Sequence, residues 1–504
     1  MPHPLFHAKN QSGTVTVCGL PRCFLGHRVG ERDGIFAGWE WNGNQLRVYN
    51  DRYGFYPLFY FATPDEIAIS PSIPQLVSLG APLEIDHDAL AIYLRLGFML
   101  GEDTPFRSIR ALPPDTRFTW SPGQLEVSGQ LAISRQHDLN RNDAVEGYIT
   151  FFREAIRKRV PAGREFCVPL SGGRDSRHIL FELYSQGFRP RFTITMEPFP
   201  ARSHEDIRIA AEVCRTLGIP HVVRPQPDTR FETELHKNWK TSFCTDEHQW
   251  ALAMAAYLRG KVECLYHGVA GDTLTESVFS TQEHVNLFAK GDFEALASTL
   301  LRLPDNGLLR KMLRPEAYRR VNPERAIARL SAELRRHAQA PNPIGSFYLW
   351  NKGRREVTLI PNCLWRDIGT TYSPYLDHDL FDFLSALPAR SIIGTGLHTE
   401  VIHKAYPQYA HLPFEDEAAP RRPNHSFYRR FARKTLQYVG LHRSAWLRNT
   451  YLIPRLMRCL ADSSYSGSIS WLAPTAIYLL QLEELVRTKG SQPNPRSLRL
   501  EETP

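Results

Sequence analysis

A loop rich in serine and glycine, followed by an aspartate, is the part of the sequence best suited to chemistry. It reads SGGRDS from Ser171 to Ser176, after a predicted strand over 165–170 and before a helix predicted to begin near Asp175. The paired glycines let backbone N–H groups approach a phosphate closely, and the helix dipole favours an anion there. The serines add hydroxyl donors, and the carboxylate of Asp175 can hold a magnesium ion. We predict a phosphate-binding loop; the plainer alternative is a Gly-Gly turn without a ligand.

Strands and helices alternate around this loop. The sequence predicts strands over 191–196, 221–223 and 262–266, and helices over 204–217 and 247–259. Such alternation is typical of a doubly wound α/β domain, in which a parallel sheet is covered by helices and ligands bind beyond the carboxyl ends of the strands. Beyond these elements, from Phe279 onward, the pattern is mainly helical and predicts no further strand.

The N-terminal part of the chain is rich in predicted strands. Two of them, over 35–41 and 45–49, flank the turn Asn42-Gly43-Asn44, and a third is predicted over 55–61. The polar segment 121–142 indicates a boundary, after which Asp143 is predicted to cap a helix. The predicted segments are a β-rich domain over 1–125, a linker over 126–142, an α/β domain over 143–420 and a helical C-terminal extension over 421–504.

Composition and charge exclude several classes of protein. Of 504 residues, 42% are hydrophobic and 23% charged, which is typical of a folded globular protein rather than a disordered or fibrous one. The net charge of +8 suits an enzyme with anionic ligands better than a nucleic-acid-binding module. We find neither an apolar run long enough to span a membrane nor a signal peptide. The eight cysteines form no Cys-x-x-Cys pair, so we expect reduced thiols and a cytoplasmic protein.

Taken with the strand before it, the Ser-Gly-Gly-x-Asp-Ser loop resembles the pyrophosphate loop of the ATP pyrophosphatase (PP-loop) superfamily. Members of that superfamily cleave ATP to AMP and pyrophosphate. Other segments resemble one branch, the asparagine synthetase family, in the same order along the chain. They are 50–60 (NDRYGFYPLFY), 86–90 (DHDAL), 104–109 (TPFRSI), 204–206 (HED), 267–272 (HGVAGD) and 373–378 (SPYLDH). The resemblance implies a degenerate, glutaminase-like (Ntn-type) first domain, then an ATP pyrophosphatase domain with a helical C-terminal part.

Position 2 departs from the pattern of the glutamine-dependent members, which carry their catalytic cysteine there. This chain has Pro2, and Cys18 and Cys23 lie well inside the domain. Glutamine hydrolysis by that route needs the thiolate, so we predict no glutaminase activity and a structural role for the first domain. In lacking the cysteine the chain is similar to β-lactam synthetases and lasso-peptide cyclases, which use an amine of the substrate itself.

Three further departures fall at Thr370, Tyr372 and Arg177, positions that line the acceptor side in the family. They weigh against aspartate as the substrate. The family's late Arg-x-Lys-Gly segment corresponds to 420–423 (PRRP), which also differs. The resemblance is therefore closer on the pyrophosphate side than on the acceptor side.

The resemblance implies that a substrate carboxylate attacks the α-phosphate of ATP, and that an amine then displaces AMP to form an amide. The implied ATP- and pyrophosphate-binding residues are Leu170, Ser171, Gly172, Gly173, Asp175, Ser176 and Gly268. Asp175 and Asp272 are the implied Mg²⁺ ligands; the alternative for Asp272 is a helix N-cap. The candidate catalytic cations for the second step are Lys404, Arg421 and Arg422, and the alternative for each is a solvated surface charge.

Three other features are open to two interpretations each. Residues 245–248 (TDEH) either orient an incoming amine or begin a helix with acids in its first turn. Arg354 and Arg355 either steady the phosphates or lie on a helical surface. The basic stretch 421–448 either binds an acidic carrier or precursor peptide or is a solvated helical face. The expected partners are a small-molecule or peptide carboxylate with an amine, and neither nucleic acid nor membrane.

We predict an AMP-forming amide ligase that does not hydrolyse glutamine and makes a specialised lactam or peptide product. The alternatives are an ammonia-dependent asparagine synthetase and a non-catalytic nucleotide-binding scaffold. A sulfur-transferring member of the superfamily is disfavoured because such enzymes commonly use paired cysteines.

Overall fold

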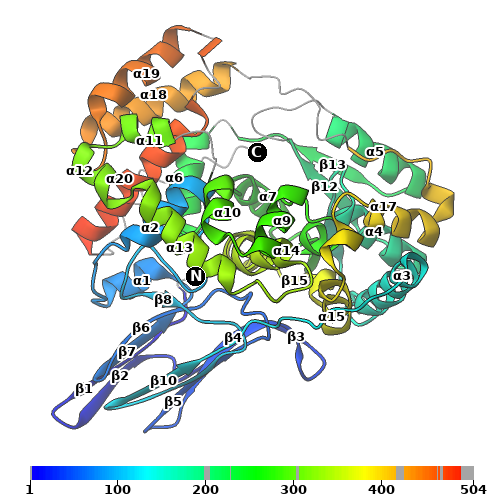
Figure 1. Cartoon of the computed structure of the whole chain (residues 1–504), viewed down its shortest axis with the longest axis horizontal. Coiled ribbons are helices and arrows are strands. Elements are labelled where there is room, and N and C mark those ends of the chain that lie inside the picture. Colours follow the sequence, from blue (N-terminus) through cyan, green and yellow to red (C-terminus); the bar gives the residue numbers. More distant parts are fainter. Residues whose placement is uncertain are drawn as a thin grey trace.

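The computed structural model describes residues 3–197, 205–227, 229–301, 306–415, 425–462, 464–465 and 469–489. Figure 1 shows the N-terminal strands at the bottom, the helix-covered parallel sheet on the right, and the last helices at the upper left. Within the described ranges, no helix combines the length and the apolar character needed to cross a membrane.

Two antiparallel five-stranded sheets pack against each other in the N-terminal domain. The first has the order β2-β1-β7-β6-β8 and contains β1 (Phe6–Gln11), β2 (Thr14–Gly19), β6 (Phe59–Thr63), β7 (Glu66–Ser70) and β8 (Arg110–Ala111). The second has the order β10-β9-β5-β4-β3 and contains β3 (Arg22–Val29), β4 (Asp33–Trp41), β5 (Leu46–Asn50), β9 (Arg117–Ser121) and β10 (Gln124–Ser128). Alternate side chains such as Ile67, Ile69, Trp39 and Val48 fill the space between the sheets.

The segment after β5 is irregular where a strand over 55–61 was predicted. The buried carboxylate of Asp51 accepts hydrogen bonds from the backbone N–H groups of Phe36, Tyr53 and Phe55 and so holds a turn there. Strand β6 therefore begins only at Phe59. The predicted turn over 42–44 is present between β4 and β5.

A five-stranded parallel sheet, of order β13-β12-β11-β14-β15, forms the centre of the second domain. Its strands are β11 (Phe166–Pro169), β12 (Phe192–Met196), β13 (His221–Arg224), β14 (Cys264–Tyr266) and β15 (Thr370–Tyr372). On one face pack α3 (Arg141–Arg157), α4 (Asp175–Ser185) and α5 (Glu205–Leu217), and on the other α7 (Trp250–Leu258) and the π-helical turn η2 (Ile360–Leu364). Because β12 and β14 flank β11 on opposite sides, the loop after β11 lies at a topological switch point.

The expectation of no strand after Phe279 was wrong, because β15 pairs with β14 in parallel register. This edge strand has three residues, too few to show a periodic pattern. The segment boundaries also differ by a few residues from the predicted ones: β10 extends the first domain's sheet to Ser128, and α3 begins at Arg141 with Asn140, rather than Asp143, as its N-cap.

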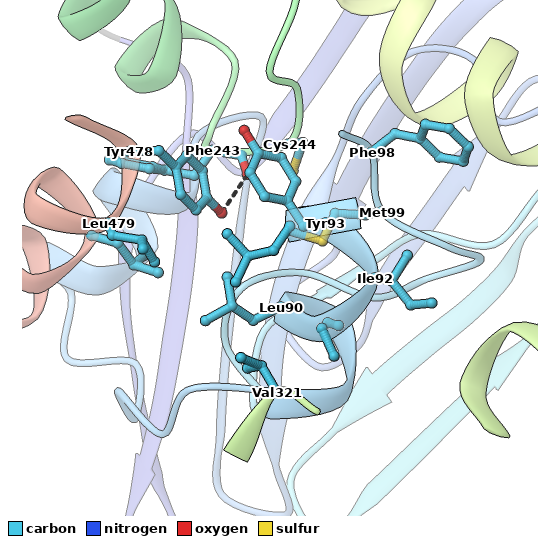
Figure 2. Close-up of a cluster of buried hydrophobic side chains, with 14 of the residues drawn as sticks. Leu90, Ile92, Tyr93, Phe98, Met99, Phe243, Cys244, Val321, Tyr478 and Leu479 are labelled. Carbon is cyan, nitrogen blue, oxygen red and sulfur yellow. Dashed lines mark hydrogen bonds between the residues drawn. The ribbon is translucent and has the colours of Figure 1, made fainter. Parts of the chain in front are cut away.

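The remaining helices pack around two hydrophobic cores, one that they share with the parallel sheet and one formed mainly among helices. They are α1 (Ile73–Ser78), α2 (His87–Leu96), α6 (Arg230–Lys240), α8 (Gly271–Thr275), α9 (Gln282–Lys290), α10 (Phe293–Leu300), α11 (Asn306–Met312), α12 (Pro315–Arg320), α13 (Pro323–Arg335), α14 (Pro343–Tyr348), the π-helix η1 (Leu349–Val357), the 3₁₀ turns η3 (Pro374–Leu376) and η4 (Pro407–Tyr409), α15 (His378–Ser385), α16 (Ala389–Ile392), α17 (Leu397–Ala405), α18 (His425–Leu441), α19 (Asn449–Ala461) and α20 (Leu472–Thr488). Figure 2 shows part of the second core, where Tyr93 of α2 stacks on Tyr478 of α20. The C-terminal helices therefore share a core with the N-terminal part of the chain.

Buried arginines connect the two domains through ion pairs and hydrogen bonds. Arg159 forms ion pairs with Asp33 of the first domain and with Asp377, where its guanidinium lies 2.7 Å from the carboxylate. Arg354 and Arg355 are also buried and donate to the backbone carbonyl of Gly101. The last two therefore neither face the phosphate loop nor lie on the surface, so both interpretations of them were wrong.

Candidate active site

The predicted phosphate loop is held in shape largely by its own side chains. The backbone N–H of Ser171 donates to Ser176 Oγ at 3.2 Å, and the N–H of Gly173 donates to Ser171 Oγ at 3.2 Å. The N–H of Gly172 donates to the carboxylate of Asp206, in the first turn of α5. Side-chain oxygens thus fix the turn between β11 and α4 without any backbone pairing inside it.

A cavity of about 930 Å³ opens beside this loop. Among the predicted ATP- and pyrophosphate-binding residues, Leu170, Ser171, Asp175, Ser176 and Gly268 lie on its wall, together with Asp272. Gly172 and Gly173 belong to the loop but do not contribute to the wall. Residues 169–176 and 267–273 are called the phosphate end of the cavity below.

Two aspartates, Asp175 and Asp272, meet at the phosphate end. The N–H of Asp272 donates to Asp175 Oδ2 at 2.9 Å. Burial, together with the charges of Asp272 and Glu276, raises the pKa of Asp175 well above its usual value. An excess of carboxylate oxygens in a buried corner is the donor set that a hard divalent cation such as Mg²⁺ requires, so the residues present fit the implied metal.

Glycines leave room for the Asp175 side chain. A Cβ atom on Gly268 would lie 2.7 Å from Asp175 Cβ, and one on Gly271 would lie 2.5 Å from Asp175 Cγ. Both distances are below normal van der Waals contact, so the Asp175 carboxylate takes up its position because these two residues lack side chains.

A buried polar network that the sequence did not reveal supports Asp175 from behind. His398 Nδ1 lies 3.5 Å from Asp175 Oδ1 and 3.0 Å from Thr275 Oγ1, while His398 Nε2 lies 3.1 Å from His178 Nδ1. Burial and the charge of Arg174 lower the pKa of His398 to about 3, so its ring is neutral. These residues are far apart in the chain and form no motif, so the sequence carried no signal for them.

Aromatic side chains form another wall of the cavity. Tyr93 of α2 and Tyr478 of α20 stack with ring centroids 4.1 Å apart, and the Tyr478 hydroxyl donates to the backbone carbonyl of Phe243 at 3.1 Å (Figure 2). Trp471 lies on this wall as well. Segments from near both ends of the sequence therefore shape the space beside the phosphate end.

Residues 245–248 do not begin a helix, and 246–248 line the cavity. Helix α7 starts only at Trp250, and His248 has a φ of 71°, outside the helical region. Lys352 of η1 faces the same place, and its ammonium lies 2.7 Å from Glu356 Oε2 and 3.8 Å from Glu247 Oε2. The group Asp246, Glu247, His248, Lys352 and Glu356 is called the acidic corner below.

The predicted catalytic cations are not brought to the described part of the cavity. Lys404 lies on α17, is 42% exposed at its side chain, and forms an ion pair of 2.8 Å with Glu146. It does not contribute to the cavity wall. Arg421 and Arg422 lie outside the described residues, as does His204.

The three predicted acceptor-side positions do not line the cavity either. Arg164 reaches the side-chain oxygens of both Thr370 and Tyr372 at the edge of the sheet. Arg177 is 1% exposed; it donates to the carbonyls of Gly172 and Pro413 and lies over the Phe414 ring. The interpretation of these residues as acceptor-side groups is therefore corrected: their side chains support the sheet and the loop.

Comparison with known proteins gives two domain matches. Residues 23–129 match the family model described as glutamine amidotransferase domain, and residues 149–359 match the one described as asparagine synthase. The chain is also 25% identical over 211 residues to asparagine synthetase (glutamine-hydrolyzing) 1 of Bacillus subtilis (strain 168). That alignment covers 40% of this chain and 33% of the relative, so the chain matches about a third of that protein's length. The predicted fold, a glutaminase-like β-rich domain followed by a parallel-sheet α/β domain with a helical C-terminal part, is confirmed.

Proposed function

We propose that this chain is a member of the asparagine synthetase family and an ATP-dependent ligase that joins a carboxylate to an amine and releases AMP and pyrophosphate. The observation that carries the proposal is the phosphate end: a closed Ser-Gly-Gly loop at a topological switch point, facing the Asp175–Asp272 pair. Beyond it the same cavity continues to the aromatic wall and the acidic corner, which leaves space for a second substrate.

In the proposed reaction the chain's residues act mainly by position and charge. The hydroxyl groups of Ser171 and Ser176 and the N-terminus of α4 border the space for the triphosphate, and a substrate carboxylate held beside them attacks the α-phosphate. Asp175 and Asp272 would hold a Mg²⁺ ion, which when bound neutralises the charge that builds up on the phosphates. The amine then displaces AMP from the acyl adenylate.

Two features support a substrate larger than aspartate. The cavity, at about 930 Å³, is at the upper end of the size range of small-molecule sites. Tyr93, Trp471 and Tyr478 give it an apolar aromatic wall away from the phosphate end. We therefore favour a specialised lactam- or peptide-forming ligase over an ammonia-dependent asparagine synthetase.

We also propose that the first domain does not hydrolyse glutamine. Cys18 is exposed on β2, and burial raises the pKa of the Cys23 thiol, which lowers its thiolate fraction at neutral pH. Neither resembles an activated nucleophile. All eight cysteines are free, which is consistent with the proposed cytoplasmic location.

The test is to incubate the protein with ATP, Mg²⁺, an amine and pools of candidate carboxylates, and to separate AMP from ADP. We expect AMP and pyrophosphate with amino-acid derivatives or peptides, and little with aspartate and ammonium. AMP with asparagine as the product would make the protein an ammonia-dependent asparagine synthetase. Folded protein that binds ATP but forms no AMP with any pool would favour the scaffold.

A further inference from the structure

We propose that the acidic corner is the binding site for the amine substrate, which it takes as a primary alkylammonium ion. This inference rests on the proposed ligase function and adds the chemical class and the place of the second substrate. Asp246, Glu247, His248 and Lys352 line the same cavity as the phosphate end, and Glu356 pairs with Lys352, so an amine held there would share the cavity with an acyl adenylate.

Among the described residues, the corner holds more carboxyl groups than cations. Asp246, Glu247 and Glu356 each supply one carboxyl group, and the Lys352 ammonium pairs with Glu356 and Glu247. Lys237 and Arg230 also border the cavity, but both pair with the buried Glu234. His248 adds no charge, because burial and the nearby Lys352 lower its pKa well below the usual value. A bound ammonium group would add a cation to these carboxyl groups.

The surroundings of the corner raise the pKa values of two of its carboxyl groups. Burial and the charge of Glu247 raise the pKa of Asp246 to about 6, and burial raises that of Glu356 to about 8, against the pull of Lys352. A bound ammonium ion would favour the ionised form of both groups. A bound cation therefore stabilises the ionised carboxylates of the corner. An uncharged ligand of the same size does not.

Asp246 is placed to meet such a ligand. Its N–H donates to the carbonyl of Gly97, and its side chain lies where a Cβ on Gly97 would be, with Oδ1 2.3 Å from that position. The carboxylate borders the cavity and forms no hydrogen bond or ion pair with another described residue. Because Gly97 has no side chain, the Asp246 carboxylate can lie at the cavity wall, where its oxygens can accept hydrogen bonds from a ligand.

His248 provides an independent sign of a ligand. Its side chain is 9% exposed, it lies on the cavity wall, and its Nε2 has no hydrogen-bond partner among the described residues. The same atom lies 3.5 Å from Glu356 Oε1. Leaving a buried polar atom without a hydrogen-bond partner destabilises the fold. The position of His248 Nε2 at a cavity wall therefore indicates that a ligand group forms the hydrogen bond.

A metal ion is the competing occupant, because Glu247, His248 and Glu356 could together offer it three ligand atoms. The ammonium of Lys352 already lies between Glu247 and Glu356, over the rings of Phe98 and Phe279 at 5.6 and 5.5 Å. A metal would have to displace this lysine, whereas an ammonium ligand can use Asp246 and His248 beside it. The geometry therefore favours the amine.

The test is a binding measurement with n-butylamine as the probe and n-butanol as its uncharged match, using the full-length protein with ATP and Mg²⁺. We expect n-butylamine to bind about tenfold more tightly than n-butanol, because hydrogen bonds between charged groups are stronger than those of an uncharged hydroxyl group. Saturation-transfer NMR titrations give both dissociation constants.

Variants of the acidic corner test whether n-butylamine binds there. Asp246→Asn and Glu356→Gln should each weaken n-butylamine binding about fivefold or more and leave ATP affinity within about twofold. Glu165→Gln removes a carboxylate at the opposite end of β11 and should change neither. If Glu356→Gln does not fold, Asp246→Asn still tests the site. This variant should fold because the Asp246 side chain forms no hydrogen bond or ion pair with another described residue.

Three results would overturn the amine site: equal binding of n-butylamine and n-butanol, n-butylamine binding that neither variant weakens, or tight Zn²⁺ or Mg²⁺ binding that Glu356→Gln abolishes. Because ATP affinity is measured on the same samples, the two proposals fail separately. Loss of amine binding with intact ATP binding removes only the amine site, and absence of ATP binding removes the ligase proposal.

Discussion

The two ends of the cavity are built in different ways. The phosphate end consists of two short segments whose side chains and glycines fix each other locally, as in the contact of Gly271 with Asp175. The acidic corner joins a loop before α7 to a π-helix about a hundred residues later, and its walls come from α2 and α20. Local constraint leaves a motif in the sequence, whereas long-range assembly does not.

This difference also separates what is general in the proposed chemistry from what is specific. The proposed AMP-forming reaction depends on the loop and on Asp175 and Asp272, which meet at the phosphate end. The acidic corner and the stacked Tyr93 and Tyr478 shape the remaining space of the cavity. We therefore expect these residues to determine the substrate specificity. Variants at one end should leave the function of the other end intact.

The largest effect is expected from Asp175→Ala at the phosphate end. Loss of one electrostatic group aimed at a transition state raises the barrier by roughly 2.7–4 kcal/mol, so AMP release should fall about 100- to 1,000-fold. Asp143→Ala is the matched control, since Asp143 also lies in the first turn of a helix but is exposed on α3. Steady-state AMP assays measure both, and an Asp175→Ala enzyme within threefold of wild type would contradict the assigned role.

Arg177→Met should destabilise the fold by roughly 1–3 kcal/mol, because it leaves the carbonyls of Leu412 and Pro413 without their donor and removes one of the donors to Gly172. Chemical denaturation measures the change in the free energy of unfolding. Arg191→Met, which removes an exposed ion pair with Glu165, should cost less than about 1 kcal/mol. Equal losses in the two variants would show that the phosphate end does not depend on the segment at 412–414.

Gly271→Ala should weaken ATP binding about tenfold, or about 1.4 kcal/mol, by pushing the Asp175 carboxylate aside. Its effect on stability should be smaller, since the clash is with a side chain that can rotate. Gly440→Ala places the same methyl group on α18, where nothing lies within 4 Å. Unchanged ATP affinity in Gly271→Ala would mean that the position of Asp175 is not critical.

The smallest effect, a several-fold change, is expected from pH at the acidic corner. The raised pKa values, about 6 for Asp246 and about 8 for Glu356, mean that both groups become ionised only as pH rises. An alkylamine keeps its charge over the same range. Affinity for n-butylamine should therefore increase from pH 5.5 to 8.5, and Glu356→Gln should remove the part of the increase above pH 7. Affinity that is flat or falls with pH would contradict this.

The same contrast explains how much the sequence predicted. The strand–loop–helix unit around Asp175 could be placed because an apolar strand, two glycines and a helix start follow one another directly. Strand β15 was missed because three edge residues carry no periodicity, and the His398 network because its members are distant in the chain.

The acceptor side was misjudged for a related reason. Aligning Thr370, Tyr372 and Arg177 with family positions said nothing about the direction of their side chains, which point into structural contacts. Likewise, the sequence offered no means of seeing that Lys404 would pair with Glu146 on the surface. Residues 245–248 were noticed for their types, but only the fold brings Lys352 and Glu356 to them.

The most direct test of the central claim follows an oxygen atom. When a carboxylate that supports AMP formation is labelled with ¹⁸O and the products are analysed by mass spectrometry, attack on the α-phosphate transfers one label to AMP as the amide forms. We predict one ¹⁸O in each AMP released. Label in inorganic phosphate with ADP as the nucleotide product, or AMP without label, would contradict the adenylating ligase proposed for this cavity.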